Sequence, residues 1–486
     1  MRLHTECENG RYNATIHLPC IVCSLRRVRV RVRVRVKDYK MRQLATQVLA
    51  YSMIVLGVPF ATLAYEPTSL DDFQNQLNSQ AEEIAALRES LDGKVDNGTS
   101  KNTVNLNGRI HADTWHFPNH DSVIEGLAGG NPQDRIGFRR MRFGVKGDIS
   151  PNMGYKIEME FAGGNDSEFR DAYLSWKELP LLGKLQLGNQ KRPYGLDHLN
   201  SSRYNVFLER PFVIESFNQD CRRFGLVSYN VSDDQRYNWR YGFYNTELMQ
   251  NDGQHINDHL QLEFAGRFAS TYRYEDKGRD YGHWAISGTT AHVDGGSNET
   301  RFRHRAEARS INRWLNTDRV PDASHYEILG LEFVRNLGPV QVVAEVLNLW
   351  MHTDADETVN YHGGYIYTSY FLTGEHMPWK RSAGILDRIK PHREFVRTSC
   401  HHKRGWGAWQ LALRWSWADF TESTQIATQA DPTAFGVDGD ALTLGLNWYW
   451  NQNARMQFNW INGDITNAAG ENGRYDIIGT RFMVDF

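Results

Sequence analysis

Stretches of about ten residues, the length of a tilted membrane-spanning strand, alternate apolar and polar side chains along this 486-residue chain. Because successive side chains of a β-strand point to opposite faces, each stretch predicts a strand with one apolar and one polar face. In residues 137–147, Met141 and Phe143 fall on one face, and Arg140 and Arg142 fall on the other. Such a strand suits a sheet with lipid outside and water inside, although a half-buried strand of a soluble protein would show the same pattern.

The alternation returns in later parts of the chain. The apolar faces of five further segments are formed by Tyr155, Ile157, Met159 and Phe161; Tyr237, Trp239, Tyr241 and Phe243; Leu260, Leu262 and Phe264; Trp409, Leu411, Leu413, Trp415 and Trp417; and Leu442, Leu444, Leu446, Trp448 and Trp450. Beyond the N-terminal region no apolar run reaches the ~20 residues that a spanning helix requires. A soluble sandwich usually has shorter strands, so we predict an all-β fold, a transmembrane antiparallel β-barrel, over residues 103–486.

The last residues of the chain alternate as well. Ile478, Phe482 and Phe486 fall on one face, and Arg481 and Asp485 fall on the other. An aromatic final residue on the apolar face is the usual mark of an outer-membrane barrel, because the barrel-insertion machinery recognises it. We therefore predict that the protein lies in the bacterial outer membrane, with membrane lipid and the insertion machinery as partners.

Residues 41–64 have the three parts of a bacterial secretory signal. Met41 begins a short charged region, Val48–Val58 is apolar, and small residues precede the cleavage that we expect after Ala64. Since a signal peptide begins a chain, we interpret Met41 as the true first residue and residues 1–40 as a mis-called extension.

Residues 65–102 predict a short periplasmic coiled-coil helix followed by a linker. Apolar residues recur every seven positions, at Leu70, Leu77, Ile84 and Leu91. About three heptads make a marginal coiled coil, which needs partner chains to be stable. The same pattern would also fit an amphipathic helix packed on the main domain. Asp-Gly at 92–93 and Asn-Gly at 97–98 end the helix and begin the linker.

The formal net charge of −3 hides a difference between the two parts of the chain. Residues 1–64 contain 11 of the 55 Lys and Arg and 3 of the 58 Asp and Glu, so the remainder carries −11. This acidic body argues against nucleic acid as a partner and confines any cationic function to a local site. Of the five cysteines, only Cys221 and Cys400 lie beyond the first 23 residues, and whether they pair is open.

Several blocks follow one another in a characteristic order. They are Phe138–Gly147, Arg170–Leu174, Leu187–Leu196, Glu209-Arg210, Arg305–Arg309, Ser369–Glu375, Gly407–Leu411, Thr443–Tyr449 and Arg481–Phe486. Together they resemble the phosphate-selective porin O/P family over Thr103–Phe486. The resemblance implies a homotrimer of barrels of about sixteen strands that pass small solutes, with Glu209-Arg210 in a pore-folded or extracellular loop. Two features depart from the family: Ala306 stands where proline is expected, and residues 379–403 form a long His- and Arg-rich loop.

Rings of Arg or Lys make a pore selective for anions, because a guanidinium group matches phosphate oxygens and dehydrates readily. The predicted pore-lining residues are Arg140, Arg142, Lys146, Lys191, Arg192, Arg210, Arg222, Arg223, Arg240, Arg301, Arg303 and Arg305. Lys191 and Arg192 begin a loop that we expect to fold into the pore. The trio Arg301, Arg303 and Arg305 alternates, and we expect it on one side of a later strand.

An alternative role for these cations is structural. They would then pair with lumen carboxylates such as Glu158, Glu160 and Asp171 and only neutralise the wall. Arg139 falls on the apolar face by phase, so we expect it near a membrane interface, where its head group can reach water.

Other chemistry finds little support in the sequence. Residues 400–402, Cys-His-His, lack the spacing of a structural zinc site, so we predict an exposed loop, no bound metal and no cofactor. No nucleophile elbow, metalloprotease helix motif or phosphate-binding loop occurs, and we predict no enzyme. The leading hypothesis is a passive outer-membrane porin for phosphate or other anions. The alternatives are a general or weakly cation-preferring porin, a structural barrel that tethers the envelope and, last, an outer-membrane hydrolase.

Overall fold

The computed structural model describes residues 2–8, 11–18, 28–33, 95–96, 101–163, 167–218, 221–249, 261–293, 300–395, 405–426 and 431–486. The chain divides into two units, Met1–Leu87 and Arg88–Phe486. In the first, β1 (Arg2–Glu8), β2 (Arg11–Leu18) and β3 (Val28–Arg33) form an antiparallel sheet. The expected signal peptide and heptad helix lie outside the described residues. At the expected linker, β4 (Val95–Asp96) pairs with β5 (Lys101–Asn102). No described helix is long and apolar enough to cross a membrane.

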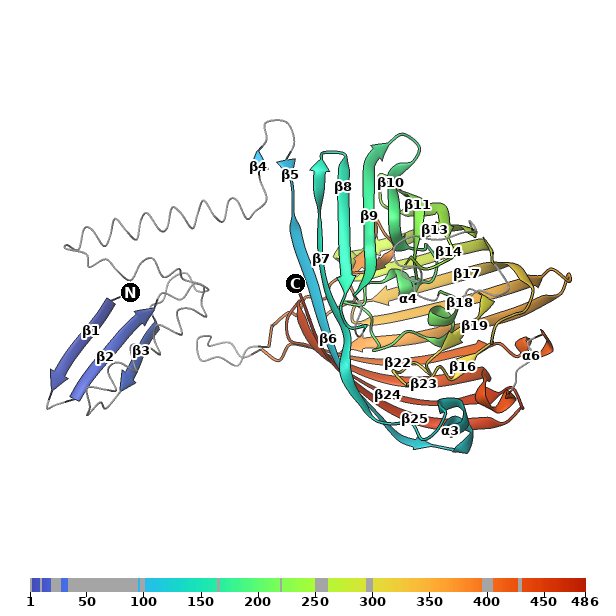
Figure 1. Ribbon diagram of the computed structural model, residues 1–486. Helices are drawn as coiled ribbons and strands as arrows, with labels where there is room; N and C mark the ends of the chain where they lie inside the picture. Colours follow the sequence, from blue (N-terminus) through green and yellow to red (C-terminus); the bar gives the residue numbers. More distant parts are fainter. Residues whose placement is uncertain are drawn as a thin grey trace. The chain divides into compact units, whose positions relative to one another are not determined.

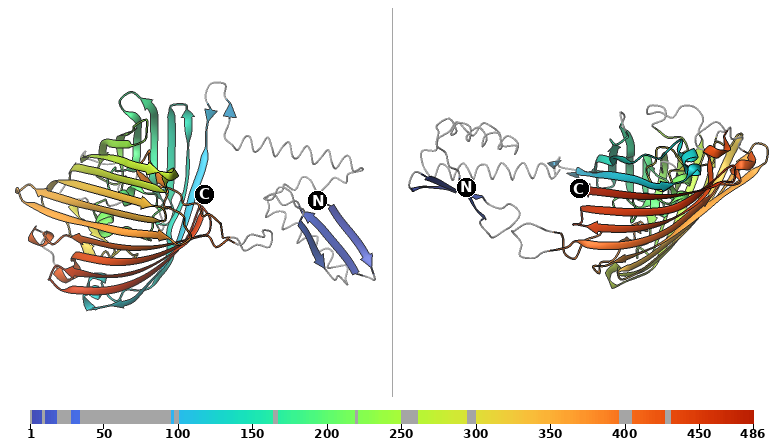
Figure 2. Two further views of the ribbon diagram at one scale, coloured as in Figure 1. Left: turned by 180° about the vertical axis from the view of Figure 1, so that it is seen from behind. Right: turned by 90° about the horizontal axis from the view of Figure 1, so that it is seen from below.

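The second unit is a closed barrel of sixteen long strands (Figures 1 and 2). The strands are β6 (Asn105–His120), β7 (Arg135–Ser150), β8 (Met153–Glu160), β9 (Glu168–Leu179), β10 (Gly183–Lys191), β11 (Arg222–Val231), β12 (Tyr237–Asn245), β13 (Leu262–Glu275), β14 (Asp280–His292), β17 (Ala323–Leu337), β18 (Val340–Thr353), β19 (Thr358–Phe371), β22 (Ala408–Asp419), β23 (Gly436–Tyr449), β24 (Ala454–Asn467) and β25 (Asn472–Asp485). Neighbours are antiparallel, β14 pairs with β17, β19 pairs with β22, and β25 closes the ring on β6. The predicted barrel is confirmed.

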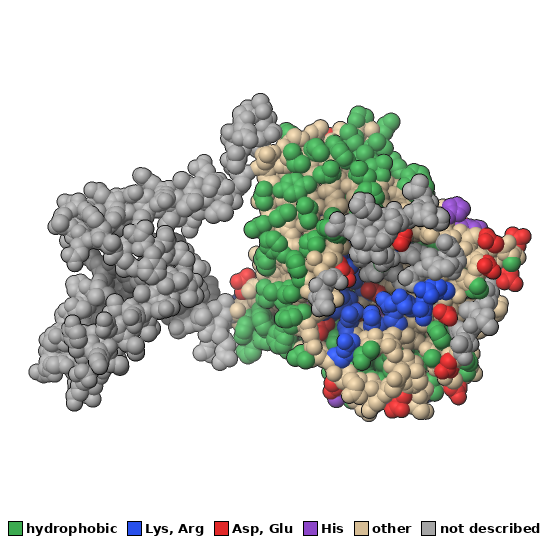
Figure 3. All heavy atoms as spheres, in the orientation of Figure 1, with side chains coloured by type: hydrophobic (Ala, Val, Ile, Leu, Met, Phe, Trp, Pro, Cys, Tyr) green, Lys and Arg blue, Asp and Glu red, His purple; other side chains and the backbone are tan. Residues whose placement is uncertain are grey.

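The two faces of the wall follow the alternation in the sequence. Phe143 and Leu413 point outward and are 45% and 42% exposed, while Arg414 and Gln457 point inward and are 2% and 0% exposed. Figure 3 shows hydrophobic side chains covering the flank formed by β6–β9, and Lys and Arg side chains gathered in a hollow of the face seen. An apolar exterior around a polar interior is the arrangement that a lipid bilayer requires of a barrel.

The two rims of the barrel differ in the length of their connections. At the rim where β25 ends, most turns are short, as between β7 and β8 and between β17 and β18. Long loops leave the opposite rim, and short turns are typical of the periplasmic side of such barrels. One connection is an exception, because residues 372–407 join β19 to β22 at the short-turn rim.

The connections contain the remaining elements. They are α3 (Ser122–Ala128), α4 (Leu196–Leu199), α5 (Phe212–Phe217), η2 (Asp276–Gly278), β15 (Arg303–His304), β16 (Leu315–Asn316), β20 (Trp379–Lys380), β21 (Ile385–Leu386), α6 (Ser423–Ile426) and η4 (Pro432–Ala434). Helix α3 begins where the Asp121 carboxylate accepts the backbone N–H groups of Val123 and Ile124, and it ends at Gly129, whose φ is 72°. These are the usual start and stop signals of a helix.

A β-bulge changes the face of one residue. In the β6–β7 register His111 pairs with Arg140 and Ala112 with Phe138, so Arg139 has no partner on β6. The extra residue shifts the phase, and both Arg139 and Arg140 point into the barrel. Arg139 Nε donates to Glu209 Oε1 at 2.7 Å. The prediction that Arg139 lies at a membrane interface is wrong because strict alternation cannot anticipate a bulge.

The β20–β21 hairpin of the connection between β19 and β22 folds back into the barrel. The ring of Trp379 stacks on Tyr281 of β14 with centroids 5.3 Å apart, and its Nε1 donates to Thr271 Oγ1 of β13 at 3.1 Å. Arg267 Nη2 of β13 donates to the carbonyl of Gly384 at 3.0 Å. The β20–β21 hairpin therefore occupies the part of the interior that borders β12–β14.

Replacement of Trp379 by alanine should release this hairpin, because removal of a buried indole costs about 3–5 kcal/mol. Trypsin treatment of the folded protein should then cut faster after Lys380 and Arg381, which lie in the hairpin. The matched control is Trp406→Ala in the same connection, since the Trp406 side chain is 76% exposed. Equal cleavage of the native chain and the Trp379→Ala variant would show that the indole does not anchor the hairpin.

Candidate functional site

A second connection, residues 192–221 between β10 and β11, also lies inside the barrel. Wall residues of β22–β24 hold its backbone. Arg414 Nη1 donates to the carbonyl of Glu209 at 3.0 Å, and Asn447 Nδ2 donates to that of Val206 at 2.9 Å. Helix α5 packs on β18, β19 and β22. These contacts place the backbone of the loop that follows Lys191 against the inner side of the wall.

Arg481 of β25 links this loop to the wall through two carboxylates. Its Nη2 lies 2.6 Å from Asp113 Oδ2 of β6 and 2.7 Å from Glu209 Oε1 of the loop. Nη1 donates to the carbonyl of Leu208 at 2.5 Å. Burial raises the pKa of Glu209, but the charges of Arg139 and Arg481 outweigh it and hold that pKa well below its usual range. The carboxylate therefore stays ionised, and the link intact, in mildly acidic solution.

The two inserted connections meet each other within the barrel. The backbone N–H of Leu386 donates to Asn200 Oδ1 at 2.9 Å, which joins the β20–β21 hairpin to the 192–221 loop. One insert covers the wall at β12–β14 and the other covers it from β18 to β25. The remaining space runs beside β6–β9, where two cavities lie.

The first cavity, called the outer cavity here, has a volume of about 270 Å³. It is lined by Phe138, Arg139, Glu160, Ala162, Gly163, Glu168, Arg170, Glu209, Glu215, Arg303, His304, Arg305, Ala308, Arg309 and Arg313. The second, called the central cavity, has a volume of about 280 Å³. It is lined by Arg109, Arg139, Arg140, Arg142, Lys156, Arg170, Asp171, Lys191, His198, Leu199, Ser201, Ser202, Arg203, Arg210, Glu215, Cys221, Arg222 and Ile385. Since Arg139, Arg170 and Glu215 line both, the two cavities adjoin.

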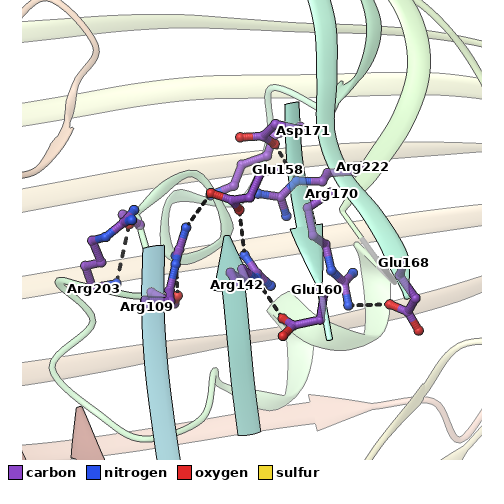
Figure 4. Close-up of polar contacts among 12 residues, drawn as sticks. Arg109, Arg142, Glu158, Glu160, Glu168, Arg170, Asp171, Arg203 and Arg222 are labelled. Carbon is purple, nitrogen blue, oxygen red and sulfur yellow. Dashed lines mark hydrogen bonds and ion pairs between the residues drawn. The ribbon is translucent and has the colours of Figure 1, made fainter. Parts of the chain in front are cut away.

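Most cations of the central cavity are paired with carboxylates in the wall behind them. Arg142 lies 2.6 Å from Glu160 and 3.2 Å from Glu158, and Arg109 lies 2.8 Å from Glu158 (Figure 4). Arg222 pairs with Asp171 at 2.5 Å. These arginines of the central cavity therefore have a mainly structural role, because the carboxylates neutralise much of their charge.

Arg140 differs from its neighbours in the central cavity. It is 4% exposed, and its Nε and Nη1 find no hydrogen-bond partner among the residues that the structure describes. A buried donor without a partner costs about 1–3 kcal/mol. The site thus contains guanidinium donors that a bound acceptor would satisfy.

The outer cavity holds arginines that no carboxylate matches. Each glutamate of its lining is engaged: Glu160 by Arg142, Glu168 by Arg170, Glu209 by Arg139 and Arg481, and Glu215 by Arg210. Within the described part of the chain, the guanidinium groups of Arg303, Arg305, Arg309 and Arg313 form no ion pair or hydrogen bond.

Burial and the proximity of these positive charges lower the pKa values of three of the guanidinium groups. Burial, followed by the charge of Arg313, lowers the pKa of Arg303 and of Arg305 to about 10. The charge of Arg139, together with burial, lowers the pKa of Arg309 to about 9. All three stay protonated at neutral pH, so the outer cavity carries a net positive charge.

The structure separates the twelve predicted residues into two groups. Those that line a cavity are Arg140, Arg142, Lys191, Arg210, Arg222, Arg303 and Arg305. Those that line neither are Lys146, Arg192, Arg223, Arg240 and Arg301.

Most residues of the second group do not line the cavities because they bind partners elsewhere in the barrel. Arg192 pairs with Glu263 at 3.0 Å, Arg223 donates to the carbonyl of Thr246, and Arg240 donates to the carbonyl of Ala383 under the hairpin.

Arg301, Arg303 and Arg305 do not belong to a wall strand. They lie in the loop between β14 and β17, and only Arg303 of the three belongs to a strand, the two-residue β15, so the predicted placement on one side of a strand is wrong. Ala306, which the resemblance would make proline, has φ of 46°. Since a proline ring holds φ near −65°, proline could not adopt this backbone.

The cationic cavity residues that sequence reasoning missed include Arg109, Lys156, Arg170, Arg203, Arg309 and Arg313. Arg170 and Arg309 belong to blocks that carry the family resemblance, and this was the signal that could have found them. Arg109 lies on β6 before the bulge. No sequence feature marked Arg313, because only the folding of the loop brings it to the cavity. Cys221 is a buried free thiol in the central cavity, and Cys400 lies outside the described residues.

Comparisons with known proteins agree with this architecture. Residues 104–486 match the family described as phosphate-selective porin O and P. Porin O of Pseudomonas aeruginosa is 22% identical over 399 residues, which cover 76% of this chain and 85% of that protein. Similar solved structures include the outer membrane channel DcaP of Acinetobacter baumannii, with a TM-score of 0.47, 11% identity, and coverage of 80% of this chain and 99% of that one. An anion-selective porin from Comamonas acidovorans has a TM-score of 0.46, 12% identity, and coverage of 79% and 99%.

Arg481→Met should loosen the 192–221 loop. Asp113 would be left buried without its arginine partner, at a cost of about 3–5 kcal/mol, and Glu209 would keep only Arg139. We expect a lower thermal unfolding temperature and a larger single-channel conductance. The control is Arg273→Met, whose pairs with Glu275 and Asp280 are exposed and contribute about 0–1 kcal/mol. Equal stability and conductance in both variants would contradict a docking role for Arg481.

Proposed function

The chain belongs to the phosphate-selective porin O and P family, and we propose that its pore prefers anions and passes phosphate-like oxyanions through the outer and central cavities. Membership makes the protein an outer-membrane porin, a channel rather than an enzyme. The anion preference and the route are the parts that we propose.

The unmatched arginines of the outer cavity carry this proposal. Six arginines and four glutamates line it, and each glutamate pairs with Arg139, Arg170 or an arginine outside the lining, which leaves Arg303, Arg305, Arg309 and Arg313 unmatched. A planar guanidinium group binds an oxyanion through two parallel hydrogen bonds. The outer cavity would therefore attract anions at the rim of the long loops and raise their local concentration.

The central cavity supports the next step of the route. Its cations face the space, while Glu158 lies behind them and is 1% exposed. Since ion pairs reduce the charge there, an anion would be held less tightly than in the outer cavity, apart from the free donors of Arg140. Strong attraction at entry followed by weaker binding suits conduction, because a channel must also release its solute.

The acidic total charge does not oppose this route. The net charge of −11 after residue 64 is spread over the chain, whereas selectivity depends on the charges that face the solute. Acidic side chains such as Asp419 and Asp476 lie away from both cavities. This separation favours the anion hypothesis over the cation-preferring alternative.

We also propose that the protein assembles as a homotrimer. The family resemblance implies a homotrimer, and the heptad repeat of residues 65–94 would join the three chains in the periplasm. Phe486 ends the chain on the outward face and is 60% exposed, which suits recognition by the barrel-insertion machinery.

Bilayer recordings across a KCl gradient test the function. The native channel should give the reversal potential of an anion-preferring pore. Replacement of Arg303, Arg305, Arg309 and Arg313 by glutamine should reduce the ratio of chloride to potassium permeability about tenfold, since loss of the four charges together removes roughly 1.4 kcal/mol of attraction in a wet cavity.

The control for this experiment is Arg273→Gln, which removes an exposed charge outside both cavities. Its reversal potential should match that of the native channel. A native channel of cation-preferring sign would refute the anion preference, and absence of conductance would support the structural barrel. An unchanged ratio of chloride to potassium permeability in the fourfold variant would show that anions do not pass through the outer cavity.

A further inference from the structure

Three side chains of the kinds that bind transition metals meet on the outer face of the barrel. The possible ligand atoms of His325, Glu327 and His352 all lie within 4.8 Å of one another. None of these residues lines the outer or the central cavity. The cluster therefore has no part in the proposed anion route.

Strand register creates the cluster. His325 of β17 pairs directly with His352 of β18, and Glu327 is two residues further along β17 on the same face. Leu329 and Leu331 continue that face and are 42% and 50% exposed, so the cluster points outward. It lies at the rim of the long loops, where β17 begins and β18 ends.

The two imidazole rings stack with centroids 4.4 Å apart, and each has one nitrogen beside a hydroxyl group and the other facing the same carboxylate. Nδ1 of His325 lies 3.0 Å from Ser324 Oγ, and Nδ1 of His352 lies 2.9 Å from Thr358 Oγ1. Each Nε2 then faces Glu327, at 3.7 Å from Oε1 for His325 and 2.8 Å from Oε2 for His352. A hydrogen bond to the other ring nitrogen is what usually orients a metal-binding histidine.

The separations also suit a tetrahedral ion. Ligands about 2.1 Å from a metal lie roughly 3.4 Å from one another. The distances from Glu327 oxygens to the two Nε2 atoms, 2.8 and 3.7 Å, lie on either side of that value. The three side chains are 30% to 39% exposed, so an ion could enter from outside and small side-chain rotations would bring the ligands around it. His292 of β14, the cross-strand partner of His325, has its ring 6.1 Å away and adds a third imidazole to the neighbourhood.

We propose that His325, Glu327 and His352 bind a divalent cation of the zinc class, with the fourth position open to water. Two neutral imidazoles and one carboxylate form a ligand set that zinc prefers. The bound ion would fasten β17 to β18 at the rim of the barrel. Another histidine on the outer face, His362, has a single carboxylate, Asp419, at 3.9 Å and lacks the further ligand.

Titration of the folded, full-length protein tests this proposal. The protein would be purified in detergent without a polyhistidine tag, stripped of metal, and titrated with Zn²⁺ against a chromophoric chelator. We expect one Zn²⁺ per chain. His352→Gln and Glu327→Gln should each weaken binding at least about tenfold. His362→Gln is the matched control and should leave the affinity unchanged.

X-ray absorption at the zinc edge of the native protein needs no variant, so a folding defect cannot obscure it. It should show two imidazole nitrogens and carboxylate or water oxygens around the ion. Binding of no stoichiometric Zn²⁺ would overturn the proposal and leave the cluster as a hydrogen-bonded rim contact. An equal loss of affinity in His362→Gln, or a zinc shell without imidazoles, would overturn it as well.

Discussion

Buried ion pairs to the wall hold the 192–221 loop inside the barrel, and the course of the pore follows from them. Arg481 joins Asp113 of the wall to Glu209 of the loop, so the loop covers the side from β18 to β25. The hairpin anchored by Trp379 covers the side at β12–β14. What stays open is the side of β6–β9, where the bulge at Arg139 adds one more guanidinium to the interior. The arginine-rich strand of the sequence thus becomes part of the wall of the two arginine-lined cavities.

The arginines of this space perform two different tasks, and burial decides between them. A charge taken out of water costs several kcal/mol unless a partner compensates it. Arg142 and Arg222 are deeply placed and have carboxylate partners at 2.6 Å and 2.5 Å. Arg305 and Arg309 lie in a loop that borders the open rim, and no carboxylate of the described residues pairs with them. They remain available to a mobile anion, whereas the paired arginines mainly hold the wall together.

Alternation in the sequence was enough to predict the barrel, its two faces and its terminal strand, because each depends only on residues two apart. It failed at Arg139, where a bulge breaks the period, and at Arg301–Arg305, where alternation occurs without an apolar face and therefore without a wall strand. The cavity role of Arg313 depends on how a loop folds back, and the cluster around His352 depends on strand register. Neither feature can be predicted from the local sequence pattern. The interpretations of residues 1–94 stay predictions.

The central claim is that the outer cavity binds an oxyanion through the guanidinium groups that no carboxylate matches. Arsenate has the shape and charge of phosphate and scatters anomalously, so diffraction from crystals grown with arsenate locates it directly. The account predicts an anomalous peak between Arg303, Arg305 and Arg309, with oxygen–nitrogen distances of about 2.7–2.9 Å. Saturating arsenate that leaves this cavity without a peak, or that binds only elsewhere in the barrel, would contradict the account.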